Sequence, residues 1–375
     1  MITAVVLGTV ATIIALLGLF GRESTKSPRP SQIVVYALPL GIVAAGYSAS
    51  VGINLLWTLV AGLSVFLAVL AGGLLGRLPV PSDQDTKPVA AGLSLGLTGL
   101  ISLGLAAVAL NWSGLLISSF TYLQSNVVSL VLLFAAVCFA IGGRSSVGMS
   151  RAVVVLLIIG AVAMFGIGFL GGDSSGLTAP QVPVPSPSPV VAIFYAIGVI
   201  LVGAGYPVLR QAGVRNKARV WTAAAVLTAI VVVTLIGILI LYGGSFQLPS
   251  LVINVPPVYA PPSVAAILCG LVAIISTVTM GAALAAASHC VAEIRPEWYT
   301  DTEDHPVPRR LIVIGLAVIV LLLNLLQLPM TAIMLMLGVA GAGNLIAELV
   351  ISRGNAKAAG PTADAVPTPA QEAHT

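Results

Sequence analysis

The sequence predicts an all-α integral membrane protein with about eleven transmembrane helices: one N-terminal helix, then a 5+5 inverted repeat. Composition is the first observation that predicts this fold class. Of 375 residues, 58% are hydrophobic and 7% are charged, whereas about 25% of the residues in a typical soluble domain are charged. Apolar runs long enough to cross the ~30 Å hydrocarbon core recur along the chain. We therefore expect a lipid bilayer around this protein.

A short repeat is the second observation. Residues 36–47 (YALPLGIVAAGY) and residues 195–206 (YAIGVILVGAGY) are identical at six of twelve positions and lie 159 residues apart. Each copy opens a run of five expected spans, and an odd number of spans inverts the second copy in the membrane. Inverted repeats are typical of secondary transporters, which bind their solute between the two halves.

The expected spans follow from the apolar runs in chain order. No basic residue precedes the first run, so it indicates a retained helix rather than a secretory signal. Residues 33–76 are long enough for two helices with a tight turn near residues 50–53. We expect spans at residues 2–20, 33–51, 54–76, 89–110, 116–142, 152–171, 190–209, 220–243, 263–287, 311–328 and 330–350.

The placement of the basic residues is the third observation. If the N-terminus is outside, all sixteen lysines and arginines fall in cytoplasmic segments and the outer loops hold none. The positive-inside rule then predicts an outside N-terminus and a cytoplasmic C-terminus in the plasma membrane. The basic segments are residues 21–32, 77–88, 143–151, 210–219, 288–310 and the tail.

Composition also divides the chain into five parts. A proline-rich segment indicates an extended connector between the repeats, outside the cytoplasm. The Ala/Pro/Thr-rich tail is expected to be disordered, and it or the loop 288–310 could bind a protein partner. The parts are residues 1–31 (N-terminal helix and basic loop), 32–172 (first repeat), 173–189 (connector), 190–351 (second repeat) and 352–375 (tail).

Charged residues and histidines are absent from the centres of the expected spans; Glu348 and His289 lie near the cytoplasmic ends. Proton-driven transporters usually bury a titratable group, and enzymes acting on lipid phosphates present charged residues near the interface. Sixteen basic against twelve acidic residues is too small an excess to indicate nucleic-acid binding. A site in the core must therefore use backbone groups, hydroxyls, amides and aromatic rings.

Helix-breaking residues provide one such candidate. Pro39 and Gly41 lie near the centre of their span, and Gly198 occupies the position of Pro39 in the second repeat. Proline removes a backbone donor and glycine loosens the helix, so freed carbonyls can bind a cation and freed N–H groups a carboxylate. The alternative is a kinked helix whose small residues pack against a neighbour.

The segment VAAGYSAS at residues 43–50 resembles a motif in the first core helix of YkvI-type bacterial membrane proteins, which have the LeuT-like fold of amino-acid–polyamine–organocation transporters. Tyr195, Gly198 and the basic segment after them resemble the sixth core helix of that fold. The resemblance covers residues 33–350 and implies a symporter. The residues that would then bind solute are Pro39, Gly41, Gly46, Tyr47, Ser48, Tyr195 and Gly198.

The same resemblance implies a sodium ion beside the eighth core helix, at residues 263–287. Sodium-coupled members have adjacent Ser/Thr hydroxyls there, which Ser276 and Thr277 would supply. A hard cation wants about five or six oxygens, and carbonyl dipoles can replace full charges. The alternative is that both hydroxyls bond back to carbonyls of their own helix. The implied ligands are Ala45, Ser48, Ala273, Ser276 and Thr277, and no other cofactor is expected.

Other polar residues indicate helix packing or a pathway. Ser94, Thr98 and Ser102 form one hydroxyl stripe, which either lines a pathway or packs against another helix. Asn344 is expected to form interhelical hydrogen bonds rather than to bind a ligand. Residues 289–305 include His, Cys and Glu side chains in no recognised zinc spacing.

We therefore predict a secondary transporter, not an enzyme, that moves a small organic solute by alternating access. The resemblance makes an amino-acid-like solute and sodium coupling the specific expectations. The alternative is a scaffold or sensor that kept the transporter fold and acts as a membrane partner in a cell-envelope complex. A polar cavity beside Pro39 and Ser276 would favour transport, and a tightly packed apolar interior would favour a scaffold.

Overall fold

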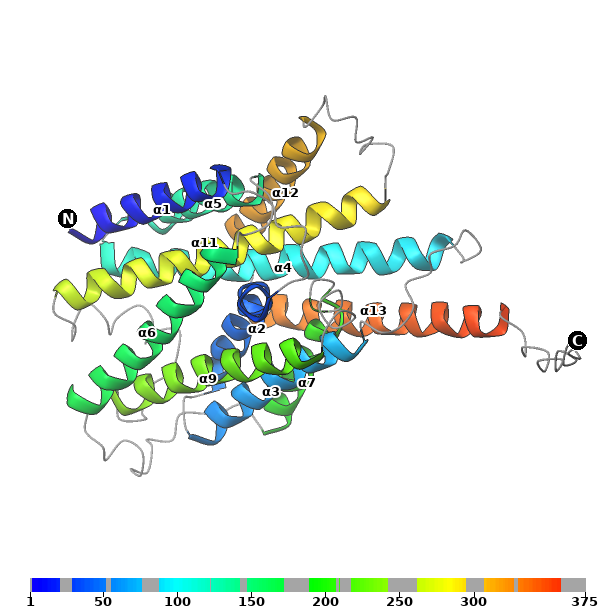
Figure 1. The fold of residues 1–375 in the computed structure, drawn as a ribbon, viewed down its shortest axis with the longest axis horizontal. Coiled ribbons are helices and arrows are strands. Elements are labelled where there is room, and N and C mark those ends of the chain that lie inside the picture. Colours follow the sequence, from blue (N-terminus) through cyan, green and yellow to red (C-terminus); the bar gives the residue numbers. More distant parts are fainter. Residues whose placement is uncertain are drawn as a thin grey trace, which may run out of the picture.

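The computed structural model describes eleven α-helices and, within the part of the chain that it describes, no β-strand. Figure 1 shows these helices as one bundle, with the two chain ends on opposite sides of the view. The described residues are 2–20, 29–51, 55–75, 88–121, 123–141, 147–171, 189–206, 209, 217–241, 262–294, 307–326 and 330–358.

The helix bounds agree with the apolar runs in the sequence for most of the chain. Four helices begin with a proline, which suits the first helical turn because its fixed φ is pre-organised and no N–H partner is needed there. In chain order, the helices are α1 (Ile2–Phe20), α2 (Pro30–Val51), α3 (Leu55–Leu75), α4 (Pro88–Thr121), α5 (Ser125–Ile141), α6 (Val147–Gly171), α7 (Pro189–Ala204), α9 (Lys217–Leu241), α11 (Pro262–Ile294), α12 (Val307–Leu325) and α13 (Met330–Ala358).

The start of α2 is capped by its own sequence. The carbonyl oxygen of Arg29 accepts hydrogen bonds from the N–H groups of Gln32 and Ile33, at 3.0 and 3.1 Å. The Gln32 side chain in turn accepts the N–H of Arg29 at 2.9 Å. This exchange between the residue before the helix and the third helical residue satisfies donors that a helix end leaves open. It therefore holds Arg29 at the end of the bundle.

Two long helices, α4 and α11, pack along each other in the interior. On one side α1 lies against α5 and α11, outside the ten helices of the expected repeats. On the other side α9 packs against α2, α3 and α6, while α7 packs against α3 and α13 (Figure 1). The two expected repeats are therefore interleaved, because α9 and α7 lie against helices of the first repeat.

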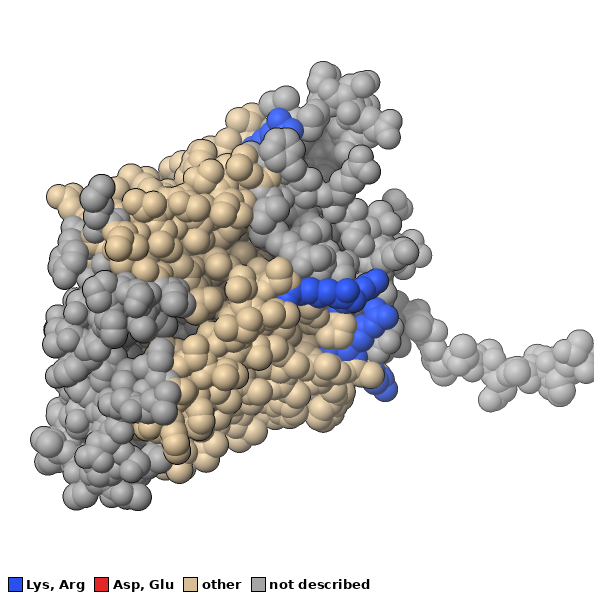
Figure 2. All heavy atoms as spheres, turned by 60° about the vertical axis from the view of Figure 1, so that its left-hand side comes forward, with Lys and Arg blue, Asp and Glu red and all other residues tan. Residues whose placement is uncertain are grey.

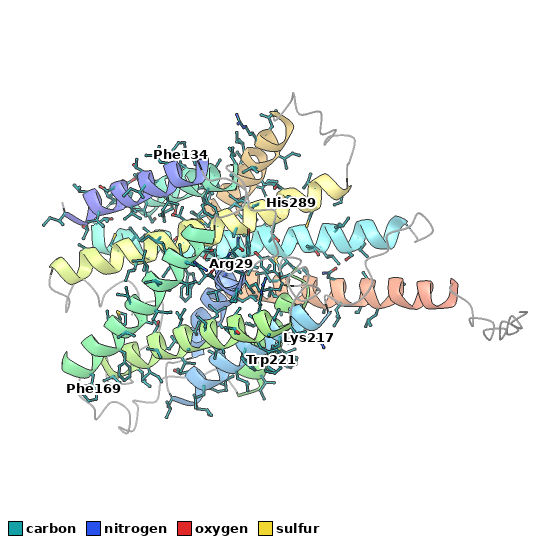
Figure 3. The ribbon with its side chains drawn as sticks, in the orientation of Figure 1. Arg29, Phe134, Phe169, Lys217, Trp221 and His289 are labelled. Atoms are coloured by element: carbon teal, nitrogen blue, oxygen red, sulfur yellow. The ribbon has the colours of Figure 1, made fainter. Side chains whose placement is uncertain are left out.

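The outer faces of the helices are apolar. Phe134 and Phe169 are 68% and 69% exposed and point away from the bundle (Figure 3). Exposed apolar surface of this extent marks contact with lipid. Four helices hold apolar stretches long enough to cross a membrane within the described residues: Leu55–Gly73, Gly92–Gly114, Lys217–Gly237 and Cys269–Val291. The chain is an all-α membrane protein.

The described basic side chains gather at one end of the molecule, and Figure 2 shows the Lys and Arg atoms along one side of the apolar body. They lie at the first residues of helices or immediately before them, as Arg29, Arg151, Lys217, Arg219 and Arg310. A one-sided distribution of this kind is what the positive-inside rule requires of the cytoplasmic ends of transmembrane helices.

Two expected features of the helices differ in the structure. An outer loop was expected near residues 111–115, but α4 continues through them to Thr121, and α5 begins at Ser125. The Ser113 hydroxyl donates to the carbonyl oxygens of Ala109 and Leu110, at 2.5 and 3.2 Å, so this polar residue is satisfied inside the helix. The seventh expected span, residues 190–209, ends as a continuous helix at Ala204.

Candidate functional site

The interruption expected at Pro39 is absent, since α2 is one continuous helix from Pro30 to Val51 with Pro39 inside it. Pro39 and Gly41 are both buried. A Cβ atom on Gly41 would lie 3.2 Å from Val231 and 3.4 Å from Leu227, both side chains of α9. The alternative weighed for this segment, small residues packed against a neighbouring helix, is what the structure describes here.

Gly198 also serves close packing. It lies within the continuous part of α7, and a Cβ atom on Gly338 of α13 would lie 3.4 Å from its Cα. Two facing glycines let the backbones of α7 and α13 approach each other, as is common for helices in membranes. The side chains of Ala45, Gly46, Tyr47, Ser48 and Tyr195 lie outside the described residues.

Helix α7 ends at Ala204, six residues after Gly198, at a position that was not singled out as a break in the helix. The N–H of Gly205 still bonds the carbonyl of Leu201 at 3.0 Å, but that of Tyr206 bonds Gly203, only three residues back, at 3.1 Å. Such tightening marks a helix end, where carbonyl groups are left without partners in the helix. Carbonyl oxygens of the last turn are then available to other helices.

Asn344 of α13 takes up one of these carbonyl oxygens. Its Nδ2 donates to the carbonyl oxygen of Gly205 at 3.3 Å and to the Thr98 hydroxyl at 3.1 Å. Its Oδ1 accepts a hydrogen bond from the Ser94 hydroxyl at 2.6 Å. Asn344 is completely buried, so this carboxamide joins α4, α7 and α13 in the interior. The expected role of Asn344 as an interhelical hydrogen-bonding residue is confirmed.

Tyr206 lies directly after the end of α7 and is completely buried. Its hydroxyl has no hydrogen-bond partner among the described residues. Tyr36 of α2 and Cys290 of α11 are close enough to interact with it electrostatically. Tyr36 begins the first copy of the repeated segment and Tyr206 ends the second copy, but periodicity alone does not bring them together. A polar group therefore faces the meeting point of α2, α7 and α11.

The expected sodium ligands on α11 are buried in a continuous helix. Ala273 and Thr277 are completely buried and Ser276 is 3% exposed. The Thr277 Oγ1 has no hydrogen-bond partner in the described structure, and the same holds for Thr279 two residues later. A buried hydroxyl without a hydrogen-bond partner costs free energy, so an unpartnered hydroxyl at an expected sodium ligand needs an explanation.

The alternative for Thr277, a bond back to its own helix, is not observed. Other hydroxyls in these helices do bond back four residues: Ser102 to Thr98 at 3.0 Å, Thr121 to Ile117 at 2.8 Å, and Thr234 to Ile230 at 2.7 Å. The Thr277 hydroxyl forms no such bond, and its helix α11 packs against α2. Its oxygen and the α11 carbonyls are ligands of the type that a hard cation prefers.

Comparison with known proteins places the fold. No family model and no curated protein matches the sequence. Among solved structures, a Na⁺-coupled sialic acid symporter in a substrate-bound outward-open state is similar in fold. The TM-score is 0.65 and the sequences are 13% identical, and the match covers 93% of this chain and 87% of the symporter. The two chains therefore share one helical architecture over almost their whole length.

Proposed function

We propose that this protein is a secondary transporter of the LeuT-like class that moves a small organic solute across the plasma membrane by alternating access. The shared architecture with a Na⁺-coupled symporter over 93% of the chain is the observation that carries the proposal. The interior agrees with it, because a buried helix end and buried polar groups lie inside an otherwise apolar bundle. Transporters bind solute at such interruptions between their repeats.

The proposed topology has the N-terminus outside and the C-terminus in the cytoplasm. Helix α1 is then additional to a 5+5 inverted repeat made of α2 to α6 and α7 to α13. The end of the bundle where basic side chains gather faces the cytoplasm under the positive-inside rule. Helix α7 runs toward this end, since α9 begins soon after it at Lys217.

The proposed solute site lies between α2 and α7, which pack against each other. Its residues are those that the resemblance implies, Pro39, Gly41, Gly46, Tyr47, Ser48, Tyr195 and Gly198. Backbone groups and aromatic rings can bind a zwitterion without a charged side chain, so an amino-acid-like solute suits this composition.

The proposed coupling ion is sodium, held by Ala45, Ser48, Ala273, Ser276 and Thr277. The Thr277 hydroxyl supports this, because it has no hydrogen-bond partner among the described residues and a cation would satisfy its oxygen. A bound sodium ion would supply one positive charge between α2 and α11. The residues of this chain would position the oxygens and exclude water from them.

One observation favours the second candidate, a membrane scaffold or sensor that does not transport. The side chains beside Pro39 are apolar and close together, and Leu40, Ala44 and Val278 belong to one buried hydrophobic cluster. A bundle that never opens would have such an interior. A scaffold would act through a protein partner at the cytoplasmic loop 288–310 or the tail.

Reconstituted protein can separate the two functions. Uptake of labelled amino acids and sugar acids into proteoliposomes would be measured with an inward sodium gradient and with an equal potassium gradient. We expect uptake of at least one solute class that is faster with sodium. Equal uptake of a bound solute in both gradients would contradict sodium coupling. If neither solute class binds or is taken up, the scaffold function is favoured.

A further inference from the structure

The Asn344 side chain forms three hydrogen bonds, each with a different residue. Both hydrogens of its Nδ2 are donated, to different helices, and its Oδ1 accepts from a third residue. An asparagine side chain offers two donors and one acceptor oxygen, so the group is close to saturation. It is therefore built to hold helices together and has little capacity left for a solute.

The helix end that Asn344 holds is also where the bundle is closed. Gly205 and Tyr206 are both buried, and the side chain of Tyr206 is completely covered. On the facing helix, Thr98 is 5% exposed and Ser102 is completely buried. Polar side chains from several helices thus gather at one end of an apolar bundle, and of those around Asn344 only Ser94 is partly exposed. A solute could leave by this end only if these helices separated.

We propose that Asn344 is a positioning residue that fastens the end of α7 to α4 and so keeps the cytoplasmic end of the transport pathway closed. The proposal rests on the transport function proposed above. Opening this end would move α7 away from α4 or from α13, and either movement breaks hydrogen bonds of the Asn344 side chain. We call the three hydrogen bonds of Asn344 with Ser94, Thr98 and Gly205 the clasp. The free energy of the clasp would then set the fraction of molecules that are open toward the cytoplasm.

The chain provides a matched control on the same stripe of α4. Ser102 is buried like Thr98, but its hydroxyl bonds back to the Thr98 carbonyl at 3.0 Å and reaches no other helix. Removing the Ser102 hydroxyl therefore changes polarity and volume at the same helix face without cutting a bond between helices. Ser94 provides a graded variant, because it makes one of the three bonds of Asn344.

Cys290 is a native reporter of opening. It is 4% exposed, and a Cβ atom on Gly99 of α4 would lie 3.7 Å from its Cβ, so α4 covers it. In the full-length protein with Cys138→Ala and Cys269→Ala, the rate of Cys290 modification by N-ethylmaleimide would be measured in proteoliposomes. When closing is faster than modification, this rate follows the population of the open state.

We expect Asn344→Ala to raise the modification rate about tenfold, which corresponds to about 1.4 kcal/mol in the opening equilibrium. Ser94→Ala should raise it less, and Ser102→Ala should leave it unchanged. Asn344→Ala would also be compared with the parent by size-exclusion profile and thermal unfolding, since general loosening would raise the rate in all three variants. If Asn344→Ala does not fold, the modification rate of Cys290 in Ser94→Ala is compared with the rate in Ser102→Ala, and a faster rate in Ser94→Ala supports the proposal.

An unchanged rate in Asn344→Ala, or equal increases in Ser94→Ala and Ser102→Ala, would overturn the clasp. This outcome is separate from a failure of transport, because modification of Cys290 needs no solute. Faster modification without uptake of any solute would leave the clasp standing and remove the transport function. Sodium-driven uptake with an unchanged rate of Cys290 modification would support the transport function and contradict the role proposed for Asn344.

Discussion

Gly203 of α7 lies directly against Ala68 of α3. A Cβ atom on Gly203 would be 2.6 Å from the Cβ of Ala68 and 2.6 Å from its carbonyl oxygen, both too close for real atoms. On α3, a Cβ on Gly72 would be 2.6 Å from the Gly203 carbonyl oxygen. The hydrophobic effect does not drive helices together inside a lipid bilayer, so their association depends on close van der Waals packing at small residues. These two glycines therefore set the distance between α3 and α7.

The first prediction is that Gly203→Ala destabilises the protein by about 1–3 kcal/mol, because the added methyl group overpacks the contact with the α3 backbone. Gly315→Ala is the matched control. Nothing lies within 4 Å of a Cβ there, so the higher helix propensity of alanine should make this change neutral or stabilising. Thermal unfolding in detergent measures both, and equal shifts would contradict the packing argument.

The second prediction concerns the Thr277 hydroxyl. In the absence of sodium, Thr277→Val should raise the unfolding temperature, because it removes a buried hydroxyl whose lack of a partner costs about 1–3 kcal/mol. The same change should abolish stabilisation by sodium, which for a bound ion at a hundred times its Kd would be about 2.7 kcal/mol. Thermal unfolding in sodium and in potassium chloride measures both effects.

Thr234→Val is the control for this pair of effects. The Thr234 hydroxyl bonds back to Ile230 at 2.7 Å, so the change should leave the sodium response intact. Ser276→Ala should weaken the sodium response in the same way as Thr277→Val. A parent protein that potassium and sodium stabilise equally would exclude the sodium site, whatever the variants show.

The third prediction is the orientation in the membrane. Single cysteines placed in the segment 172–189 should react with an impermeant maleimide added to intact cells, and those in the segment 210–219 should not. The charge distribution requires this, since the first segment holds no basic residue and the second holds four. Reaction of the second segment from outside would reverse the topology and the assignment of the closed end to the cytoplasm.

The fourth prediction follows from the repeated segment. Tyr36 and Tyr206 lie within electrostatic reach of each other, and an inverted repeat would relate this pair to Tyr195 and Tyr47. The tyrosines of each copy lie eleven residues apart, or about 16 Å along a helix. If the repeat is inverted, Tyr47 and Tyr195 should therefore meet at the opposite end.

Paired cysteine substitutions and a short bis-maleimide test this relation. We expect cross-links for Tyr36→Cys with Tyr206→Cys and for Tyr47→Cys with Tyr195→Cys. The mixed pair Tyr36→Cys with Tyr195→Cys lies at opposite ends and should not react. Cross-linking of the mixed pair alone would show that the copies are parallel, which would contradict the inverted repeat.

The apolar pattern predicted the helices well where hydropathy alone decides them. The end of α2 and the starts of α3, α4, α7, α11 and α13 lie within about three residues of the expected positions, an agreement typical of strongly apolar segments. The pattern was wrong at residues 111–115, which were expected to form the loop between the spans 89–110 and 116–142. Ser113 satisfies its hydroxyl inside α4, and a sequence does not show which polar side chains find such partners.

The candidate site was predicted less completely. Asn344 was correctly expected to bond between helices, but its partner Gly205 lies 139 residues away. Of the two readings weighed for Pro39, an interrupted helix and a packed helix that contains the proline, the structure describes the second, because a proline can remain inside a membrane helix when neighbours and local adjustments satisfy the freed carbonyl. The carbonyl group of Gly205, directly after the end of α7, is instead satisfied by the Asn344 carboxamide of another helix.

The sequence by itself determined the class of protein and the end at which its basic residues gather. Span length and charge placement are properties of a linear pattern, and the bilayer responds to them one segment at a time. Only the tertiary structure decided which polar groups meet: Thr277 has no hydrogen-bond partner within the described part of the chain, and the Gly205 carbonyl accepts a hydrogen bond from Asn344. Those outcomes depend on the packing of helices distant in sequence, because a buried polar group is satisfied only by what its neighbours bring to it.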